Sequence, residues 1–253
     1  DSTALGFMAG FTGKEIANRL KNYGCCTDFI HVEKGLSRIN VKMKSNEETE
    51  INGQGPNITE ENIEELYRKL DNIKDGDILV ISGSIPSFLP DDIYERIMQR
   101  QAEKNVKIVV DATNNLLLKV LKYHPFLIKP NHHELGELFN VTLTTQEEVI
   151  PYAKKLQEMG AINVLVSMAG KGAVLIDEHG EVHHSKAPKG TVINSVGAGD
   201  SMVAGFISGY LESNKDYAQA FIKGICCGSA SAFSENLATK KEVEELLHSL
   251  NQK

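Results

Sequence analysis

A glycine-rich turn that ends in a carboxylate is the sharpest chemical signal in the sequence. Residues 194–201 read NSVGAGDS, and the small and apolar residues that follow from Met202 are typical of a buried helix. Glycine lets the backbone approach a ligand closely, and the N–H groups at a helix N-terminus bind anions. Asp200 stands where it could take a proton from a hydroxyl group or simply cap the helix. A carboxylate beside an anion site suits phosphoryl transfer.

The turn differs from two common nucleotide motifs. No Gly-Lys-Ser/Thr follows it, so it is not a Walker A loop, and it is not a GxGxxG turn after a first strand. Polar or small residues also follow each of four apolar runs. They are SGS at 82–84, DAT at 111–113, KPN at 129–131 and SMAG at 167–170. Because ligands of open α/β sheets bind at the carboxyl ends of the strands, we expect these segments to converge on one site.

Strands that alternate with helices are predicted to carry these segments. Short apolar runs, rich in β-branched residues, lie at 78–81, 108–110, 126–128 and 164–166. Apolar residues recur with helical spacing at 63–70, at 93–97 and at 243–250. The order predicts a three-layer α/β fold with a mostly parallel central sheet. The segment from Thr3 to Phe7 is expected to form one further strand.

One segment, residues 36–53, breaks this alternation. Apolar and polar residues alternate through 39–44, a turn is expected at Asn46, and the chain then leads back. This pattern predicts an antiparallel hairpin with one solvent-facing side. We therefore expect an α/β domain formed by residues 1–35 and 54–253, from which the hairpin projects as a lid or an interface. The alternative is an excursion without a function.

Composition excludes several classes of protein. The chain has 253 residues and 27.8 kDa, long enough to bury a sizeable core, and a net charge of −7. That charge argues against a nucleic-acid or membrane-surface binder, and no apolar run approaches the roughly 18 to 20 residues of a membrane helix. The predicted partners are small molecules. If these are anionic, a few placed cations or a metal must hold them.

The cysteines indicate a reducing compartment. They occur as two adjacent pairs, Cys25-Cys26 and Cys226-Cys227, which is no disulfide framework and has no zinc-binding spacing. We interpret them as small buried residues of a cytoplasmic protein.

Five motifs in order make the sequence similar to the PfkB/ribokinase family of sugar kinases, from residue 1 to about residue 245. They are RINVK at 38–42 with ETEING at 48–53, SGSIP at 82–86, KPNHHE at 129–134, SMAGKG at 167–172 and GAGD at 197–200. The resemblance implies a ribokinase-like fold, ATP as phosphoryl donor and Mg²⁺ as cofactor. Within the family, the hairpin motif resembles the branch that acts on fructose 1-phosphate.

The implied reaction is ATP-dependent phosphorylation of fructose 1-phosphate at the 6-hydroxyl, which gives fructose 1,6-bisphosphate. Two alternatives stay open: a kinase for tagatose 6-phosphate or another sugar phosphate, and a binding module without activity. The second arises because the family's N-terminal GGKG-type substrate motif has no counterpart here. The chain is expected to start after that motif, and to bind nucleotide better than sugar phosphate. A homodimer formed through the lid is a further implied partner.

The resemblance assigns roles to individual residues. Asp200 would be the general base, with Gly197, Ala198 and Gly199 supplying the N–H groups that bind the anion. Arg38 and Ser84 would hold the phosphate of the sugar, since a guanidinium fits a phosphate with two hydrogen bonds. Either could instead be an ordinary surface group.

The nucleotide and metal sites are implied in the same way. The residues implied in nucleotide binding are Lys129, Asn131, Ser167, Gly170, Gly172, Gly228, Ser229 and Asn236. Asn131 and Glu134 would hold Mg²⁺ through water, although their spacing also fits a capping box. The alternative for Lys129 is a solvated lysine. The pairs His132-His133 and His183-His184 are not expected to bind zinc, because adjacent residues do not share a helix face.

Overall fold

The computed structural model describes residues 2–44, 48–86, 89–112 and 114–251. The turn expected at Asn46 lies outside these ranges. The chain forms two compact units. The first comprises Asp1–Asp77 and Ser84–Val106, and the second Ile78–Gly83 and Lys107–Lys253. Every helix in the described ranges is too short or too polar to span a bilayer.

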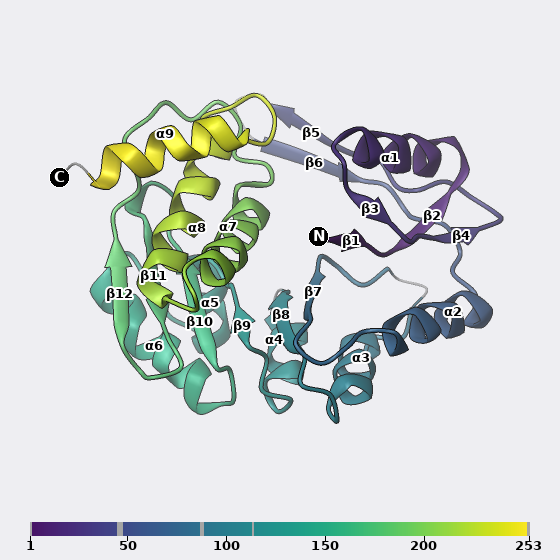
Figure 1. The fold of residues 1–253 in the computed structure, drawn as a ribbon, viewed down its shortest axis with the longest axis horizontal. Helices are drawn as coiled ribbons and strands as arrows, with labels where there is room; N and C mark the ends of the chain where they lie inside the picture. Colours follow the sequence, from purple (N-terminus) through teal and green to yellow (C-terminus); the bar gives the residue numbers. More distant parts are fainter. Residues whose placement is uncertain (1, 45–47, 87–88, 113, 252–253) are drawn as a thin grey trace. The chain divides into compact units, whose positions relative to one another are not determined.

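The second unit is built on a six-stranded sheet with the order β12-β11-β10-β9-β8-β7 (Figure 1). The strands are β7 (Ile78–Ser82), β8 (Lys107–Asp111), β9 (Leu127–Ile128), β10 (Asn163–Ser167), β11 (Ala173–Ile176) and β12 (Val182–Ser185). Strands β7 to β10 are parallel, whereas β11 and β12 are antiparallel. The four predicted strands and the mostly parallel sheet are confirmed. The carboxyl ends of β7 to β10 therefore share one edge, as expected.

Helices cover both faces of this sheet (Figure 1). They are α4 (Asn114–Leu121), α5 (His132–Phe139), α6 (Gln146–Glu158), α7 (Ala198–Glu212), α8 (Tyr217–Ala232) and α9 (Lys240–Asn251). On one face, Leu127, Leu165 and Leu175 of the strands form a core with Phe206 of α7 and Phe221 of α8. On the other face, α6 packs against β10 and β11. The layers and the predicted C-terminal helix are confirmed.

Glycines let α7 and α8 pack closely. A Cβ atom added to Gly205 would lie 2.6 Å from Cys227 Sγ, and one added to Gly224 would lie 3.0 Å from the Met202 carbonyl oxygen. The GxxxG spacing of α7 and α8, which also occurs in membrane helices, here serves close helix packing.

The first unit consists of short strand pairs and three helices. They are β1 (Thr3–Ala4), β2 (Phe7–Ala9), α1 (Gly10–Asn22), β3 (Cys26–Thr27), β4 (Ile30–Val32), β5 (Asn40–Lys44), β6 (Glu48–Asn52), α2 (Glu60–Asp71) and α3 (Ile93–Gln101). β1 pairs with β3 and β2 with β4, both in parallel. The expectation of one strand over Thr3–Phe7 was wrong, because the chain leaves regular pairing at Leu5–Gly6. The predicted apolar face of α2 is buried.

The predicted hairpin is confirmed as the antiparallel pair β5–β6, in which Val41 lies opposite Ile51. The apolar side chains on it are nevertheless exposed: Ile39 to 60%, Val41 to 46%, Met43 to 47% and Ile51 to 56%. Alternation predicted one polar, solvent-facing side. The structure leaves the apolar side uncovered as well.

The cysteines are only partly buried. All four are free, and Cys226 is buried, which raises the pKa of its thiol to about 12. Cys26 is exposed, so the prediction of four buried cysteines was wrong. The difference arises because β3 has a single neighbouring strand, whereas Cys226 lies in the packed helix α8.

Candidate active site

The glycine-rich turn leads into α7 in a geometry that excludes Asp200 as the N-cap of this helix. Gly197 is the N-cap residue, with φ of 79°, and the helix begins at Ala198. Asp200 therefore lies inside the first turn, where its side chain is exposed and does not cap the helix. The left-handed backbone of Gly197 explains why glycine is needed there. The N–H groups that follow it are at the positive end of α7.

The end of α8 holds this turn in place. The backbone N–H groups of Ile193 and Asn194 both donate to the Ala232 carbonyl oxygen, at 2.8 and 3.1 Å. The Asn194 amide also donates to the Glu235 carbonyl oxygen at 3.1 Å. A Cβ atom on Gly228 would lie 3.0 Å from the Ala198 carbonyl oxygen. Gly228 is thus explained by packing against the turn.

Two other residues named for the nucleotide site lie close to this region in the chain. Ser229 follows Gly228 on α8 and is half-buried, and Asn236 lies in the bend after the helix and is exposed. Their role in nucleotide binding stays a prediction.

Lys129 lies at the base of the turn. It follows β9, is only 7% exposed, and its Nζ atom lies 3.3 Å from Asp111 Oδ1. A Cβ atom on Gly199 would lie 3.0 Å from the same Nζ atom. The solvated-lysine alternative is therefore wrong. The buried ammonium adds a full positive charge to the N–H groups of the turn, and glycine at 199 leaves room for it.

Asp111 belongs to the segment 111–113 that was expected at the site, but sequence reasoning gave it no individual role. It is the last residue of β8, and burial raises the pKa of its carboxyl group. The Lys129 ammonium lowers that pKa, while the carboxylates of Asp200 and Glu134 raise it. The carboxylates of Asp200 and Glu134 are thus close enough to act on Asp111. An aspartate directly after a buried strand, beside the strand that ends at Lys129, was the signal that could have found it.

Asn131 and Glu134 form the capping box of α5. Asn131 Oδ1 accepts from the N–H groups of His133 and Glu134, both at 2.9 Å, and Glu134 Oε2 accepts from the Asn131 N–H at 2.8 Å. This bonding employs one of the two carboxylate oxygens of Glu134. The second Glu134 oxygen is the kind of ligand that suits a hard cation that keeps its water. This residue therefore fits a Mg²⁺ ion held through water.

The loop after β10 lies next to Asn131. Ser167 forms an isolated parallel bridge with Asn131, and its N–H donates to the Pro130 carbonyl oxygen at 3.2 Å. A single 3₁₀ turn, Ala169–Lys171, contains the exposed Gly170. Gly172 follows with φ of 93°, and a Cβ atom there would lie 1.9 Å from the Ser185 carbonyl oxygen. Only glycine fits this position.

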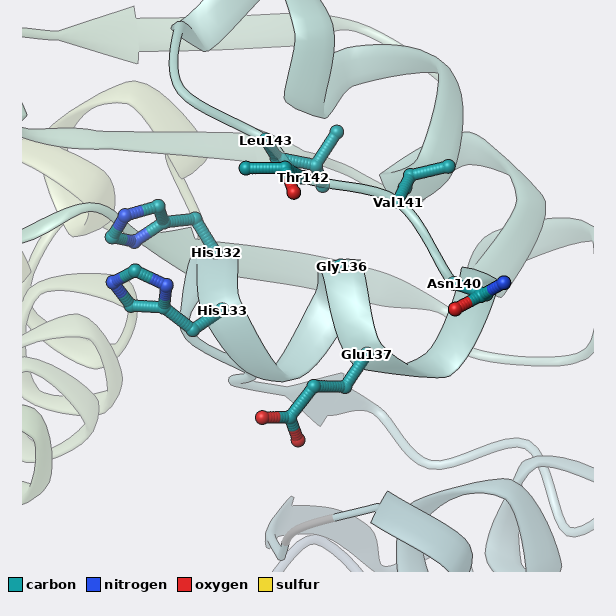
Figure 2. A pocket seen from close by; sticks show the side chains of 8 residues that line it. All are labelled: His132, His133, Gly136, Glu137, Asn140, Val141, Thr142 and Leu143. Atoms are coloured by element: carbon teal, nitrogen blue, oxygen red, sulfur yellow. The ribbon is translucent and has the colours of Figure 1, made fainter.

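The adjacent histidines line a hollow of about 330 Å³ beside α5 (Figure 2). The rings of His132 and His133 lie 3.9 Å apart, closer than the helix-face argument suggested. His132 Nδ1 is buried without a hydrogen-bond partner, and burial lowers the pKa of this imidazole. Asn140 lies at the other end of α5 and points away from the two rings (Figure 2). The polar groups of the hollow therefore do not converge on one ligand position.

His183 belongs to a group with Asp177 and Glu181 whose ligand atoms lie within 4.8 Å of one another. The buried Asp177 carboxylate is already bonded within the β11–β12 turn. It accepts from the N–H groups of His179 and Glu181 and lies 2.8 Å from His183 Nε2. We interpret this group as a set of hydrogen bonds that stabilises the β11–β12 turn.

Arg38 and Ser84 meet within the first unit, where Arg38 Nη1 donates to Ser84 Oγ at 3.1 Å and both side chains are exposed. Arg38 lies in the hairpin segment 36–53, just before the first residue of β5. The buried Ser37 beside it holds the chain to the rest of the unit. The Ala9 N–H donates to Ser37 Oγ at 3.1 Å, and Thr12 Oγ1 donates to the Ser37 carbonyl oxygen at 2.8 Å.

The comparisons with known proteins agree on one protein family. The profile of the pfkB family of carbohydrate kinases matches residues 1–244. The 1-phosphofructokinase of Bacillus subtilis is 48% identical over 97% of this chain and 80% of its own length. The D-tagatose-1-phosphate kinase of Bacillus licheniformis is 39% identical over the same shares. The tetrameric inhibited form of Escherichia coli phosphofructokinase-2 gives a TM-score of 0.87 at 26% identity, over 98% of this chain and 82% of that one. The chain belongs to the pfkB family of carbohydrate kinases.

The Asp111–Lys129 pair yields a stability prediction. Asp111→Asn should lower the free energy of unfolding by roughly 3 kcal/mol, because it leaves a buried ammonium without its counter-charge. Urea denaturation followed by circular dichroism measures this. Asp71→Asn is the control, since it breaks an ion pair with Arg100 whose side chains are both more than 40% exposed and screened by water. Equal losses in the two variants would contradict a special role for the buried pair.

Proposed function

We propose that this protein transfers the γ-phosphoryl group of ATP to the 6-hydroxyl of fructose 1-phosphate, giving fructose 1,6-bisphosphate. The observation that carries the proposal is the buried Lys129 ammonium beneath the Gly197–Gly199 turn, with the exposed carboxylate of Asp200 in the same turn. The identity of 48% to a 1-phosphofructokinase supports the choice of substrate.

In this proposal the turn binds the charge that moves. The N–H groups of Gly197, Ala198 and Gly199, together with Lys129, stabilise the negative charge on the transferring phosphoryl group. Asp200 accepts the proton of the attacking hydroxyl. Because it is exposed and makes no capping hydrogen bond in the described part of the chain, its carboxylate can reach a bound acceptor.

Mg²⁺ would be held through water by Glu134 and Asn131, and it would neutralise charge on the triphosphate when bound. Asn131 contributes by fixing the start of α5, which sets the direction of the Glu134 carboxylate. Ser167, Gly170 and Gly172 would form the loop against the nucleotide, with Gly228, Ser229 and Asn236 on its other side.

The general-base role of Asp200 has a direct test. Asp200→Asn should lower turnover by about 10²- to 10⁴-fold, because the amide cannot accept the proton, while Mg·ATP binding persists. A coupled assay for ADP and calorimetry with Mg·ATP measure the two effects. Asp216→Asn is the matched control, since Asp216 caps α8 and asparagine caps a helix equally well. Near-normal turnover of Asp200→Asn would remove Asp200 from the reaction.

Arg38 and Ser84 are proposed to bind the phosphate that the sugar already carries. Their hydrogen bond holds a guanidinium and a hydroxyl side by side, both exposed. A guanidinium offers several N–H donors in a fixed plane, so it can bond to Ser84 and to a phosphate oxygen together.

Loss of the Arg38 guanidinium should change KM for one substrate and not for the other. Arg38→Ala should raise KM for the sugar phosphate roughly tenfold to a hundredfold, as expected for one charge-assisted hydrogen bond, and leave KM for ATP nearly unchanged. Initial rates with each substrate varied in turn measure this. Arg19→Ala, which removes another exposed arginine of the first unit, should change neither constant. Equal shifts for both substrates would place Arg38 outside the sugar site.

A second candidate substrate is tagatose 1-phosphate, favoured by the identity of 39% to a D-tagatose-1-phosphate kinase. The ratio of kcat/KM for fructose 1-phosphate and tagatose 1-phosphate decides between them. A ratio well below one would replace the first substrate by the second.

Residues 36–53 are proposed to act as a lid and to pair with the same segment of a second copy. The support is the apolar side of the hairpin, which is uncovered in the single chain. A relative, Escherichia coli phosphofructokinase-2, has a tetrameric form.

The small-molecule partners and the free cysteines support a cytoplasmic location, which fractionation with an antibody would test.

A charge placed on the hairpin should disrupt this dimer. Val41→Lys would bury an ammonium in the proposed interface, so sedimentation equilibrium should change from dimer to monomer. Leu211→Lys, at an apolar residue of α7 that is 63% exposed, should leave the dimer intact. A wild-type chain that remains monomeric at micromolar concentration would refute the proposal.

A further inference from the structure

One glutamine side chain fastens the loop after β10 to a neighbouring strand. The Gln146 amide Nε2 donates to the Lys171 carbonyl oxygen at 2.8 Å and to the Ser185 carbonyl oxygen at 2.8 Å. Lys171 is the last residue of the 3₁₀ turn in the loop, and Ser185 is the last residue of β12. A single half-buried amide thus bridges two backbone segments that come from different parts of the chain.

The N-terminus of α6 gives this amide a fixed base. Gln146 is the first residue of the helix, and Thr145 and Glu148 form its capping box. The Glu148 carboxylate accepts from the N–H groups of Thr144, at 2.7 Å, and Thr145, at 3.1 Å, and hydrogen bonds from Thr144 keep its pKa low. The carboxylate therefore stays ionised near neutral pH and keeps the helix start in place.

A second bond ties the loop back to the same helix start. Lys171 Nζ donates to the Thr144 carbonyl oxygen at 2.7 Å. Gln146 therefore holds the loop at the Lys171 backbone, and the Lys171 side chain holds the loop to the Thr144 carbonyl oxygen. Gly172 closes the arrangement, since a Cβ atom there would lie 1.9 Å from the Ser185 carbonyl oxygen and 2.8 Å from Ala187 N. The loop and the end of β12 are in direct backbone contact, and Gln146 spans that contact.

We propose that Gln146 is a positioning residue for nucleotide binding, which rests on the proposed role of residues 167–172 as the nucleotide loop. Its amide does not need to touch the ligand. It fixes the carbonyl oxygens of Lys171 and Ser185, and thereby the path of the backbone between Ser167 and Gly172. Without the amide, two carbonyl oxygens lose a donor and the loop samples other paths, so the nucleotide must order it on binding.

Substitution of this amide should weaken nucleotide binding selectively. Gln146→Leu keeps most of the side-chain volume and removes both hydrogen bonds. We expect Kd for the non-hydrolysable analogue Mg·adenylyl imidodiphosphate, measured by calorimetry, to rise roughly tenfold, and KM for ATP to rise in parallel. KM for fructose 1-phosphate should stay unchanged. An unchanged Kd for the analogue would overturn the proposal.

The same helix supplies a matched control. Gln157 Nε2 also donates to two carbonyl oxygens, those of Ile162 at 3.0 Å and Asp177 at 2.6 Å, at the opposite ends of β10 and β11. Gln157→Leu should lower the melting temperature about as much as Gln146→Leu and leave Kd for the analogue unchanged. If both variants weaken nucleotide binding equally, the effect is general stability and the proposal fails.

A second variant guards against a chain that does not fold. Gln146→Glu has the same shape, and a carboxylate is favourable in the first turn of a helix, so this variant should fold. It cannot donate to the two carbonyl oxygens, so Kd should rise at least as much as in Gln146→Leu. The rise should persist at 0.5 M salt, where the added charge is screened. Wild-type affinity in this variant would overturn the proposal. Failure of the wild-type chain itself to bind the analogue would instead count against the proposed function.

Discussion

The second unit is organised around one buried positive charge. The Lys129 ammonium lies between the Asp111 carboxylate, at 3.3 Å, and the backbone of Gly199. A buried charge is tolerated only when it is paired, so Asp111 sets the condition under which Lys129 can be there at all. Gly199 contributes as well, because a Cβ atom there would lie 3.0 Å from Nζ and the flexible end of the lysine would have to shift. The turn that begins α7 and the ends of two parallel strands thus meet at this ammonium.

Parallel register is what brings these groups together. β8 and β9 are neighbours, so Asp111 at the end of one lies beside Lys129 just after the other. β9 and β10 are also neighbours, which places Asn131 next to Ser167. Chain segments separated by dozens of residues thus reach one edge of the sheet without long loops, and each polar side chain is placed by a strand end rather than by a flexible segment.

Much of this was predictable from the sequence, and the exceptions have physical reasons. The buried strands and α2 follow local periodicity, and so they were found, as was the capping box of Asn131 and Glu134. Local sequence did not show that Lys129 is buried, because its ion-pair partner Asp111 lies on another strand. The same holds for Gln146, whose two acceptors lie on segments 25 and 39 residues away along the chain. The burial of Cys26 was predicted wrongly, because it depends on how many strands lie beside β3.

The charges of the site explain why a cation belongs to its proposed chemistry. The chain carries a net charge of −7, and the carboxylates of Asp200 and Glu134 both raise the pKa of the Asp111 carboxyl group. Lys129 is already paired with Asp111. A triphosphate would therefore enter a region where its own charge meets carboxylates, and backbone dipoles alone are a modest compensation. A divalent cation that accompanies the nucleotide reduces this repulsion, because it neutralises part of the triphosphate charge and gives the carboxylates a positive partner. The acidic character of the site thus fits the metal–nucleotide complex of the proposed function better than the free nucleotide.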